Sequence, residues 1–273
     1  MLENRTGFWA IIRPFYHGLL RLLFPGGLKR TMNGTDTIFL AHTLHGIPNE
    51  LEPGVWPIIM NELRPGDTVV EVGSFIGLYT VAMARRVGSA GMVYAFEPTR
   101  EAGDYLRENI RLNKVVDRVQ VCPYVVGRED GEVHFNAGKG SESSVVTNNE
   151  DQPDAQRTVM VRLDSFLEGQ RVDLLKIDAE GYEIHILQGA CELLEQHEHA
   201  PRMICIEVHP SVWSKHGVDG AMLLELLRRA GYDVYDTDGR RVAAIGDYGE
   251  IFAYRAGEYR EWFKHEAQEK SPD

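Results

Sequence analysis

Apolar and polar positions alternate in blocks along the chain, and each block has the length of one strand or one helix. Short, nearly continuous apolar runs predict buried strands, whereas longer mixed stretches, such as 77–86 and 99–114, predict helices that cover them. The predicted strands are 68–72, 92–96, 118–126, 172–178, 202–208, 232–236 and 250–255. Buried strands separated by helices predict an α/β fold, with a mostly parallel seven-stranded sheet and helices on both faces.

The pattern also predicts a small β insertion and the limits of three units. Residues 132–135 and 158–163 have strand-like patterns and are expected to pair as an antiparallel insertion, joined by a polar loop. We expect the chain to consist of an N-terminal helical segment, a main domain and a charged tail, at 1–50, 51–258 and 259–273.

The N-terminal segment is basic and amphipathic between residues 8 and 30, "FWAIIRPFYHGLLRLLFPGGLKR". Arg13 and Arg21 interrupt its apolar positions, so no run approaches the roughly 20 residues that a bilayer span needs. It also lacks the small-residue cleavage site of a signal peptide. Two interpretations stay open: a helix that lies on an anionic membrane as a peripheral contact, and a helix that packs on the main domain.

Composition and charge exclude some partners. The 43% hydrophobic content is typical of a globular protein, and the net charge of −12 disfavours nucleic acid as a partner, which needs a basic face. The three cysteines lack metal-ligand spacing, and an odd number argues against a disulfide framework. We therefore expect a cytoplasmic protein in a reducing compartment.

A glycine-rich turn follows the first predicted strand of the main domain. Gly73 and Gly77 are four positions apart, and Phe75 occupies the place where a dinucleotide-binding turn needs its middle glycine. No Lys-Ser or Lys-Thr follows, so the turn is not a P-loop. We expect Gly73, Ser74, Phe75 and Gly77 to contact a nucleoside ligand that carries no diphosphate.

Two carboxylates accompany this turn. Glu97 ends the second strand and could accept hydrogen bonds from both ribose hydroxyls, while Glu71 could hold a ligand ammonium, directly or through water. A carboxylate at each end of the bound ligand suits S-adenosylmethionine, which carries a ribose diol, an ammonium and a sulfonium. The polar segment 138–145 is expected to cover this ligand, with Ser144 in contact; the alternative is a disordered hairpin tip.

Four strings together resemble a known family. "VVEVGSFIGLYT", "VYAFEP", "LRENIRLN" and "VDLLKIDAEGYE" are similar, in this order, to the FkbM-type S-adenosylmethionine-dependent methyltransferases over about residues 50–210. The resemblance implies a class I, Rossmann-like methyltransferase fold. It also implies O-methylation of a sugar, a glycolipid or a glycosylated natural product. The family usually has Asn where this chain has Phe75, so no contact carries over to that position.

Methyl transfer to a hydroxyl requires a group that removes its proton. Asp178 ends the fourth strand, Glu207 and His209 end the fifth, and carboxyl ends of parallel strands meet at one edge of a sheet. We expect these three as catalytic residues, with Asp178 also contacting the cofactor. They form either a site for Mg²⁺ or another divalent cation, or a base, His209, oriented by an acid. Alternatively, these acids only anchor the cofactor or loops and are neutralised by Lys176.

Two other functions remain open. An N-methyltransferase that acts on a base or amide usually has a Pro-Pro-Tyr-like segment after the fourth strand, where this chain has Ala179-Glu180-Gly181-Tyr182. A non-catalytic partner subunit could also retain the fold. The acceptor, a small molecule or a glycan, and the oligomeric state are not specified by the sequence.

Overall fold

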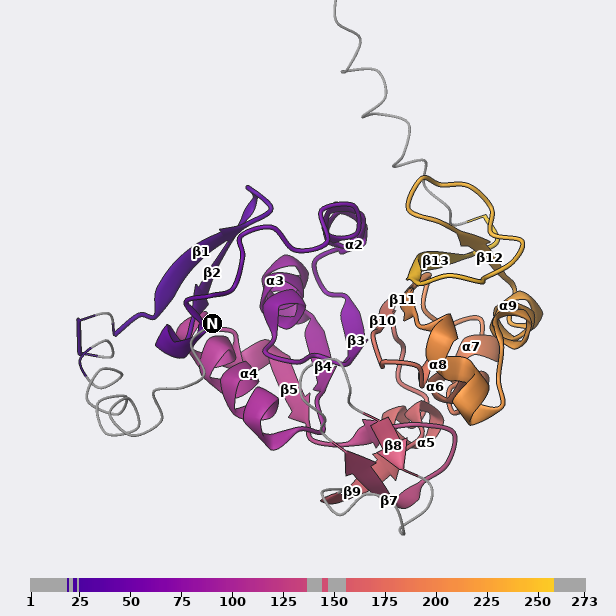
Figure 1. Cartoon of the computed structure of the whole chain (residues 1–273). Helices are drawn as coiled ribbons and strands as arrows, with labels where there is room; N and C mark the ends of the chain where they lie inside the picture. The colour runs from indigo at the N-terminus through magenta and orange to yellow at the C-terminus, as the bar shows by residue number, and fades with distance from the viewer. Residues whose placement is uncertain (1–18, 20–21, 24, 137–143, 147–155, 258–273) are drawn as a thin grey trace, which may run out of the picture.

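The central sheet of the molecule has seven strands, and all but one of them run parallel. The computed structural model describes residues 19, 22–23, 25–136, 144–146 and 156–257 (Figure 1). In spatial order the strands are β12 (Tyr232–Tyr235), β13 (Gly249–Arg255), β11 (Met203–Val208), β10 (Leu174–Ile177), β3 (Thr68–Val72), β4 (Met92–Phe96) and β5 (Val119–Cys122). Only β13 runs in the direction opposite to the other six strands. The predicted α/β fold with a mostly parallel seven-stranded sheet is therefore confirmed.

Helices cover both faces of the sheet, as the continuous apolar strands require. One face carries α2 (Trp56–Glu62), α3 (Leu78–Val87) and α4 (Arg100–Leu112), whose buried residues share a core with alternate sheet residues such as Val69 and Val93. The other core includes Val70, Leu175 and Ile204. Its helices are α5 (Leu163–Leu167), α6 (Glu183–Gln188), α7 (Cys191–Glu195), α8 (Pro210–Trp213) and α9 (Gly220–Arg229) (Figure 1). Single 3₁₀ turns are η1 (His42–Leu44), η2 (Gly88–Ala90), η3 (Val116–Arg118) and η4 (Ser214–His216).

A second sheet confirms the predicted β insertion. Its strands, in spatial order, are β6 (Val125–Val126), β9 (Gln156–Val161), β7 (Gly131–Asn136) and β8 (Ser144–Val146). The expected antiparallel pair is β7 with β9, in which Val133 lies opposite Thr158. Most of the predicted cover at 138–145 lies outside the described residues. Ser144 begins β8 and pairs with Asn136, and its contact with a ligand stays a prediction.

The expectation of a helical N-terminal segment is wrong for residues 28–40. These residues form an antiparallel hairpin of β1 (Leu28–Met32) and β2 (Asp36–Leu40). Asn33 and Gly34 make its turn with φ values of 47° and 73°, the left-handed region that an Asn-Gly hairpin turn needs. Met32, Ile38 and Leu40 are fully buried in the core that contains residues of α3 and α4, so the hairpin is packed onto the main domain.

The predictions for both ends of the chain fall largely on residues that the structure does not describe. Residues 1–18 and 258–273 lie outside the described part, and with them most of the basic segment and the predicted tail. Membrane contact through residues 8–30 therefore stays a prediction. In the part of the chain that is described, no helix combines the length and the apolar character required to cross a membrane.

Candidate functional site

The turn between β3 and α3 can be made only with glycine at two positions. Gly73 has φ 83°, and a Cβ atom there would lie 1.8 Å from the backbone oxygen of Asp178. Gly77 has φ 84°, and its Cβ would lie 2.4 Å from Cδ1 of Leu106 on α4. Left-handed backbone and close approach both exclude larger side chains. The turn thereby brings the carboxyl ends of β3 and β10 together.

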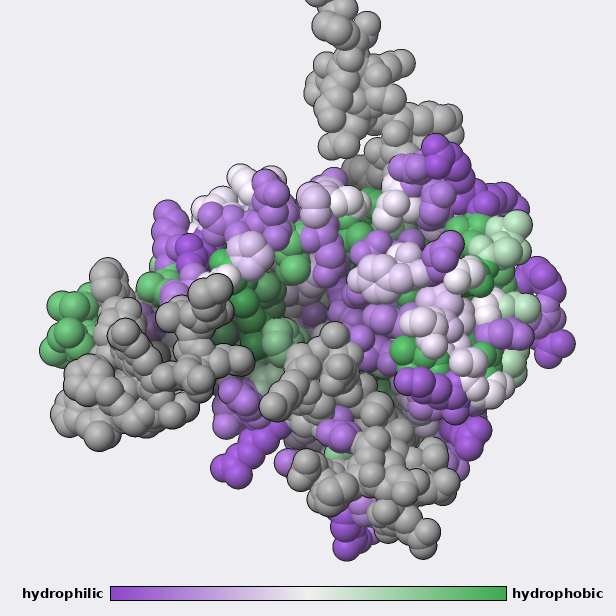
Figure 2. Space-filling view, viewed as in Figure 1, coloured by the Kyte–Doolittle hydropathy of each residue, from purple (hydrophilic) through white to green (hydrophobic). Residues whose placement is uncertain are grey.

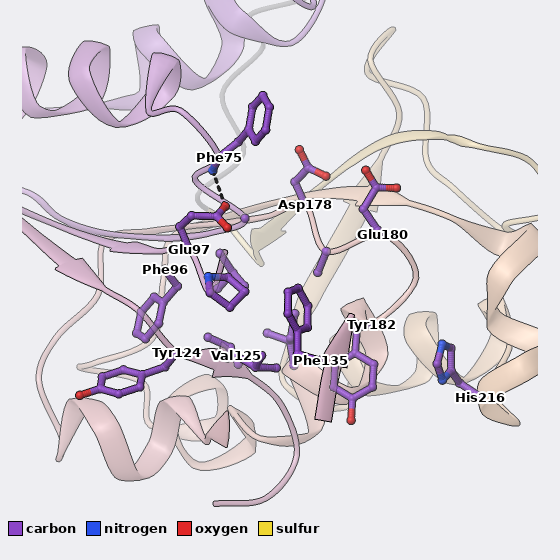
Figure 3. A pocket seen from close by; sticks show the side chains of 16 residues that line it. Phe75, Phe96, Glu97, Tyr124, Val125, Phe135, Asp178, Glu180, Tyr182 and His216 are labelled. Atoms are coloured by element: carbon purple, nitrogen blue, oxygen red, sulfur yellow. Dashed lines mark hydrogen bonds between the residues drawn. The ribbon is translucent and has the colours of Figure 1, made fainter. Parts of the chain in front are cut away.

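Glu97 lies at the carboxyl end of β4 and faces the same turn. Its Oε2 accepts a hydrogen bond of 2.8 Å from the backbone N–H of Phe75 (Figure 3). Its Oε1 accepts hydrogen bonds from the backbone N–H of Thr99, at 2.8 Å, and from the Thr99 hydroxyl. Burial raises the pKa of Glu97, and these hydrogen bonds partly oppose that rise. The carboxylate is thus held in one orientation before any ligand arrives.

A pocket of about 310 Å³ opens beside Glu97 and the glycine turn. Figure 3 shows three carboxylates at its upper side and aromatic rings below them. The carboxylates belong to Glu97, Asp178 and Glu180, and the rings to Phe96, Tyr124, Phe135 and Tyr182. A mostly apolar cavity with a few convergent polar groups is the usual form of a small-molecule site.

These residues fit a nucleoside that carries a ribose diol. Gly73 lines the pocket, and Oε2 of Glu97, which accepts one hydrogen bond, retains a lone pair for a hydroxyl donor. Phe96, Tyr124 and Val125 provide apolar surface of the kind that an adenine ring packs against. Phe75 also lines the pocket, and its side chain is 59% exposed. The expected cofactor, S-adenosylmethionine, therefore matches the groups present.

Glu71 and Ser74 lie beneath the turn rather than in the pocket wall. Glu71 is 1% exposed and accepts a hydrogen bond from the Thr80 hydroxyl. Burial raises the pKa of Glu71 to about 7, against the opposing charge of Lys176 on the neighbouring strand. The Ser74 hydroxyl donates to the backbone oxygen of Glu71 at 3.3 Å. Direct contact of either side chain with a ligand stays a prediction.

Asp178, Glu207 and His209 lie together at the ends of β10 and β11, as the sequence predicts. One ligand atom from each of the three lies within 4.8 Å of the others. Near the centre of Figure 2, hydrophobic surface beside α3 and α4 gives way to hydrophilic surface beside β10 and β11. Asp178 also lines the pocket, which makes the cluster and the pocket parts of one site. The chemical roles of the three residues remain predictions.

The surroundings of this cluster disfavour a hard cation. Lys176 lies 3.5 Å from Oδ2 of Asp178, where its ammonium already neutralises the carboxylate. His209 offers nitrogen, whereas Mg²⁺ prefers oxygen ligands. Its Nδ1 lies 2.7 Å from Oε1 of Glu183 and is not available to an ion. The predicted divalent cation stays a prediction that the donor set supports poorly.

Three carboxylates surround His209 and set its charge. Nε2 lies 3.4 Å from Glu180 and 3.8 Å from Glu207, and Nδ1 is bonded to Glu183. Burial lowers the pKa of His209, but Glu183, Glu180 and Glu207 together outweigh burial and raise this pKa to about 8. Burial and the neighbouring charge of Asp178 raise the pKa of Glu207 to about 7. Both pKa values therefore lie near neutral pH, where each group can gain or lose a proton.

Sequence reasoning missed Glu183 and Tyr248 as members of the site. Glu183 is the first residue of α6, and its place two residues after Gly181 in the Asp-x-Glu-Gly-x-Glu string was the available signal. The Tyr248 hydroxyl donates to Oε1 of Glu207 from the loop before β13, and no local pattern marked it. His216 also lines the pocket, with its ring beside that of Tyr182.

Comparisons with known proteins point to methyltransferases. A family model described as the methyltransferase FkbM domain matches residues 71–234. The chain is 23% identical over 206 residues to the hexuronic acid methyltransferase AglP of Haloferax volcanii, covering 73% of this chain and 75% of that protein. It is 24% identical over 199 residues to the methyltransferase sdnD of Sordaria araneosa, covering 61% and 73%. Among solved structures, the S-adenosylmethionine-dependent O-methyltransferase of Thermotoga maritima has a TM-score of 0.43 at 15% identity, covering 78% and 68%.

Proposed function

Because the chain belongs to the methyltransferase FkbM domain family, we propose that it transfers a methyl group to a hydroxyl of a sugar, a glycolipid or a glycosylated natural product. Its methyl donor is S-adenosylmethionine, as the family and the fold indicate. The observation that carries the proposal is the position of His209. Its Nε2 faces Glu180 and Glu207 beside the pocket, while its Nδ1 is bonded to Glu183.

His209 supplies the base that a hydroxyl acceptor needs. When bound, S-adenosylmethionine supplies a methyl on a sulfonium, which an acceptor oxygen takes as the sulfur–carbon bond breaks and its electron pair stays on sulfur. Nε2 of His209 accepts the hydroxyl proton, and the resulting imidazolium is stabilised by Glu180, Glu183 and Glu207. The proton then passes to solvent.

The charges of the site support a hydroxyl rather than a carboxylate acceptor. Glu180 lies in the pocket wall, and its negative charge repels an anionic group that approaches it. A carboxylate acceptor also needs no base, which would leave His209 without a task. A relative that is named for a hexuronic acid supports sugars as the acceptor class. Such a sugar carries both hydroxyls and a carboxylate, and the alkali test below distinguishes a methyl ether from a methyl ester.

Radiolabelled methyl transfer tests the proposal directly. The protein is incubated with labelled S-adenosylmethionine and with lipid, glycan and protein fractions of the source cell. We expect label in the glycan or glycolipid fraction that resists mild alkali, as a methyl ether does. Label released by mild alkali would indicate a methyl ester and contradict the hydroxyl assignment. Label in protein amines would favour N-methylation, and absence of transfer despite cofactor binding would favour a partner subunit.

A further inference from the structure

The carboxylate of Glu183 receives three hydrogen bonds in a place that solvent does not reach. Its side chain is fully buried at the start of α6. Oε1 lies 2.7 Å from the backbone nitrogen of Gly181 and 2.7 Å from Nδ1 of His209. Oε2 lies 2.7 Å from Nε1 of Trp213. Elements far apart in the chain thus converge on one carboxylate.

The N–H groups of Gly181 and Trp213 determine how the imidazole of His209 can bind Glu183. A backbone N–H and an indole N–H can only donate, so both carboxylate oxygens act as acceptors. An ionised carboxylate between them can only accept from the imidazole, which places the proton of a neutral His209 on Nδ1. Nε2 then carries the free lone pair, and it faces Glu180 and Glu207 at the edge of the pocket.

We propose that Glu183 is the positioning residue of the reaction: it keeps the proton of His209 on Nδ1 and thereby leaves Nε2 as the atom that takes the acceptor's proton. This inference rests on the proposed function, in which His209 is the base. Glu183 itself does not line the pocket, so it acts through the histidine. The same logic orients a histidine base by a buried carboxylate in unrelated hydrolases.

A structural role alone is the competing explanation. The hydrogen bond from Gly181 and the burial of the carboxylate could serve only to fix the turn before α6. A variant at Glu183 that merely loses activity would not separate the two roles. The experiment therefore combines Glu183→Gln with His209→Ala in a double-mutant cycle, on the full chain and with the acceptor found by radiolabelling.

We expect Glu183→Gln to lower kcat by about 100-fold, with KM for acceptor and donor within about threefold of wild type. In a His209→Ala background, the same substitution should change kcat by less than about twofold, because no base remains to be positioned. If Glu183→Gln still lowers kcat about 100-fold in that background, Glu183 acts structurally and the inference is overturned.

Nitrogen-15 NMR of the histidines provides a readout that needs no acceptor. At about pH 9 His209 is neutral, since its pKa lies at about 8. We expect the Nδ1–H tautomer in the wild type and a mixture or the Nε2–H tautomer in Glu183→Gln. The resonance is assigned by its loss in His209→Ala. An unchanged tautomer in Glu183→Gln would overturn the inference even if hydroxyl methylation were established.

Trp213→Phe is the matched control. It removes the donor to Oε2 of Glu183 and leaves the bond between Oε1 and His209. We expect the wild-type tautomer and kcat within about threefold of wild type, although loss of a buried donor lowers stability. A tautomer change in this control as large as that in Glu183→Gln would show that general disruption, rather than the histidine bond, is responsible.

Discussion

The backbone N–H of Phe75 and the carboxylate of Glu97 are joined by a hydrogen bond of 2.8 Å across 22 positions of the sequence. The bond ties the glycine turn after β3 to the carboxyl end of β4. Phe75 itself has φ 47°, a conformation that bulky residues rarely adopt. The pocket wall is therefore organised by backbone geometry that the surrounding fold enforces, before a ligand contributes any contact.

Removal of the Glu97 carboxylate should weaken cofactor binding. We expect Glu97→Ala to cost about 2–3 kcal/mol of S-adenosylmethionine affinity, the value of charge-assisted hydrogen bonds to the ribose. Titration calorimetry measures this affinity, and circular dichroism checks the fold. Glu101→Ala, an exposed acid on the next helix, is the control and should bind as the wild type does. Equal affinities for both variants would remove Glu97 from the cofactor site.

The contact between Gly73 and Asp178 predicts an unequal effect of two glycine substitutions. Gly73 and Gly66 have similar φ values, 83° and 91°, but a Cβ at Gly66 meets no atom within 4 Å. Gly66→Ala should therefore cost only the backbone strain of about 1–2 kcal/mol. Gly73→Ala adds a clash with the backbone of Asp178, just after β10, and should cost at least about 3 kcal/mol of unfolding free energy. Urea denaturation compares them, and similar losses would contradict the close approach.

The strands were the most predictable part of the fold. The predicted strands 68–72 and 92–96 coincide with β3 and β4, because each is a continuous apolar run that is buried on both faces. The pattern predicts one strand over 118–126, but the run divides at Pro123, which lacks an N–H for the ladder. Its second half, β6, pairs with β9 in the other sheet.

Two errors show where local patterns failed. The hairpin at 28–40 was missed although Asn33-Gly34 is a strong turn signal, because aromatic and aliphatic residues before it favoured a long helix. In the site, Asp178, Glu207 and His209 were predicted because strand ends meet at one sheet edge. Glu183 lies on a helix, and although the Asp-x-Glu-Gly-x-Glu string marks its position, the string does not show that its side chain turns toward His209.

A chelator should leave the enzyme active. Lys176 neutralises Asp178 at 3.5 Å, and Glu183 occupies Nδ1 of His209, so the cluster offers few free oxygens to a divalent cation. We expect EDTA followed by dialysis to change turnover by less than about twofold. Loss of activity that Mg²⁺ or Mn²⁺ restores would instead establish the cluster as a metal site and make His209 a ligand rather than the base.

The pH dependence of turnover should follow His209. Glu183, Glu180 and Glu207 face the imidazole of His209, and the centroid of the Tyr248 ring lies 5.4 Å from the imidazole centroid. The pKa of His209 lies at about 8. Only the neutral ring accepts a proton, so kcat should rise about tenfold per pH unit below the pKa and level off above it. Stopped assays over a pH series, corrected for acceptor saturation, measure this profile.

Stability should change in the opposite direction over the same range. Folding raises the pKa of His209 from an ordinary 6.5 to about 8. Its contribution to the free energy of unfolding is therefore fully present below pH 6.5 and is lost as pH rises through about 8. This contribution amounts to up to about 2 kcal/mol for the side chain, which is only 11% exposed. Urea unfolding of wild type and His209→Gln along the pH series isolates it as a difference. A wild-type advantage that stays constant from acid to alkaline pH would show that the carboxylates do not hold the proton on His209, and the proposed pH profile of turnover would lose its cause.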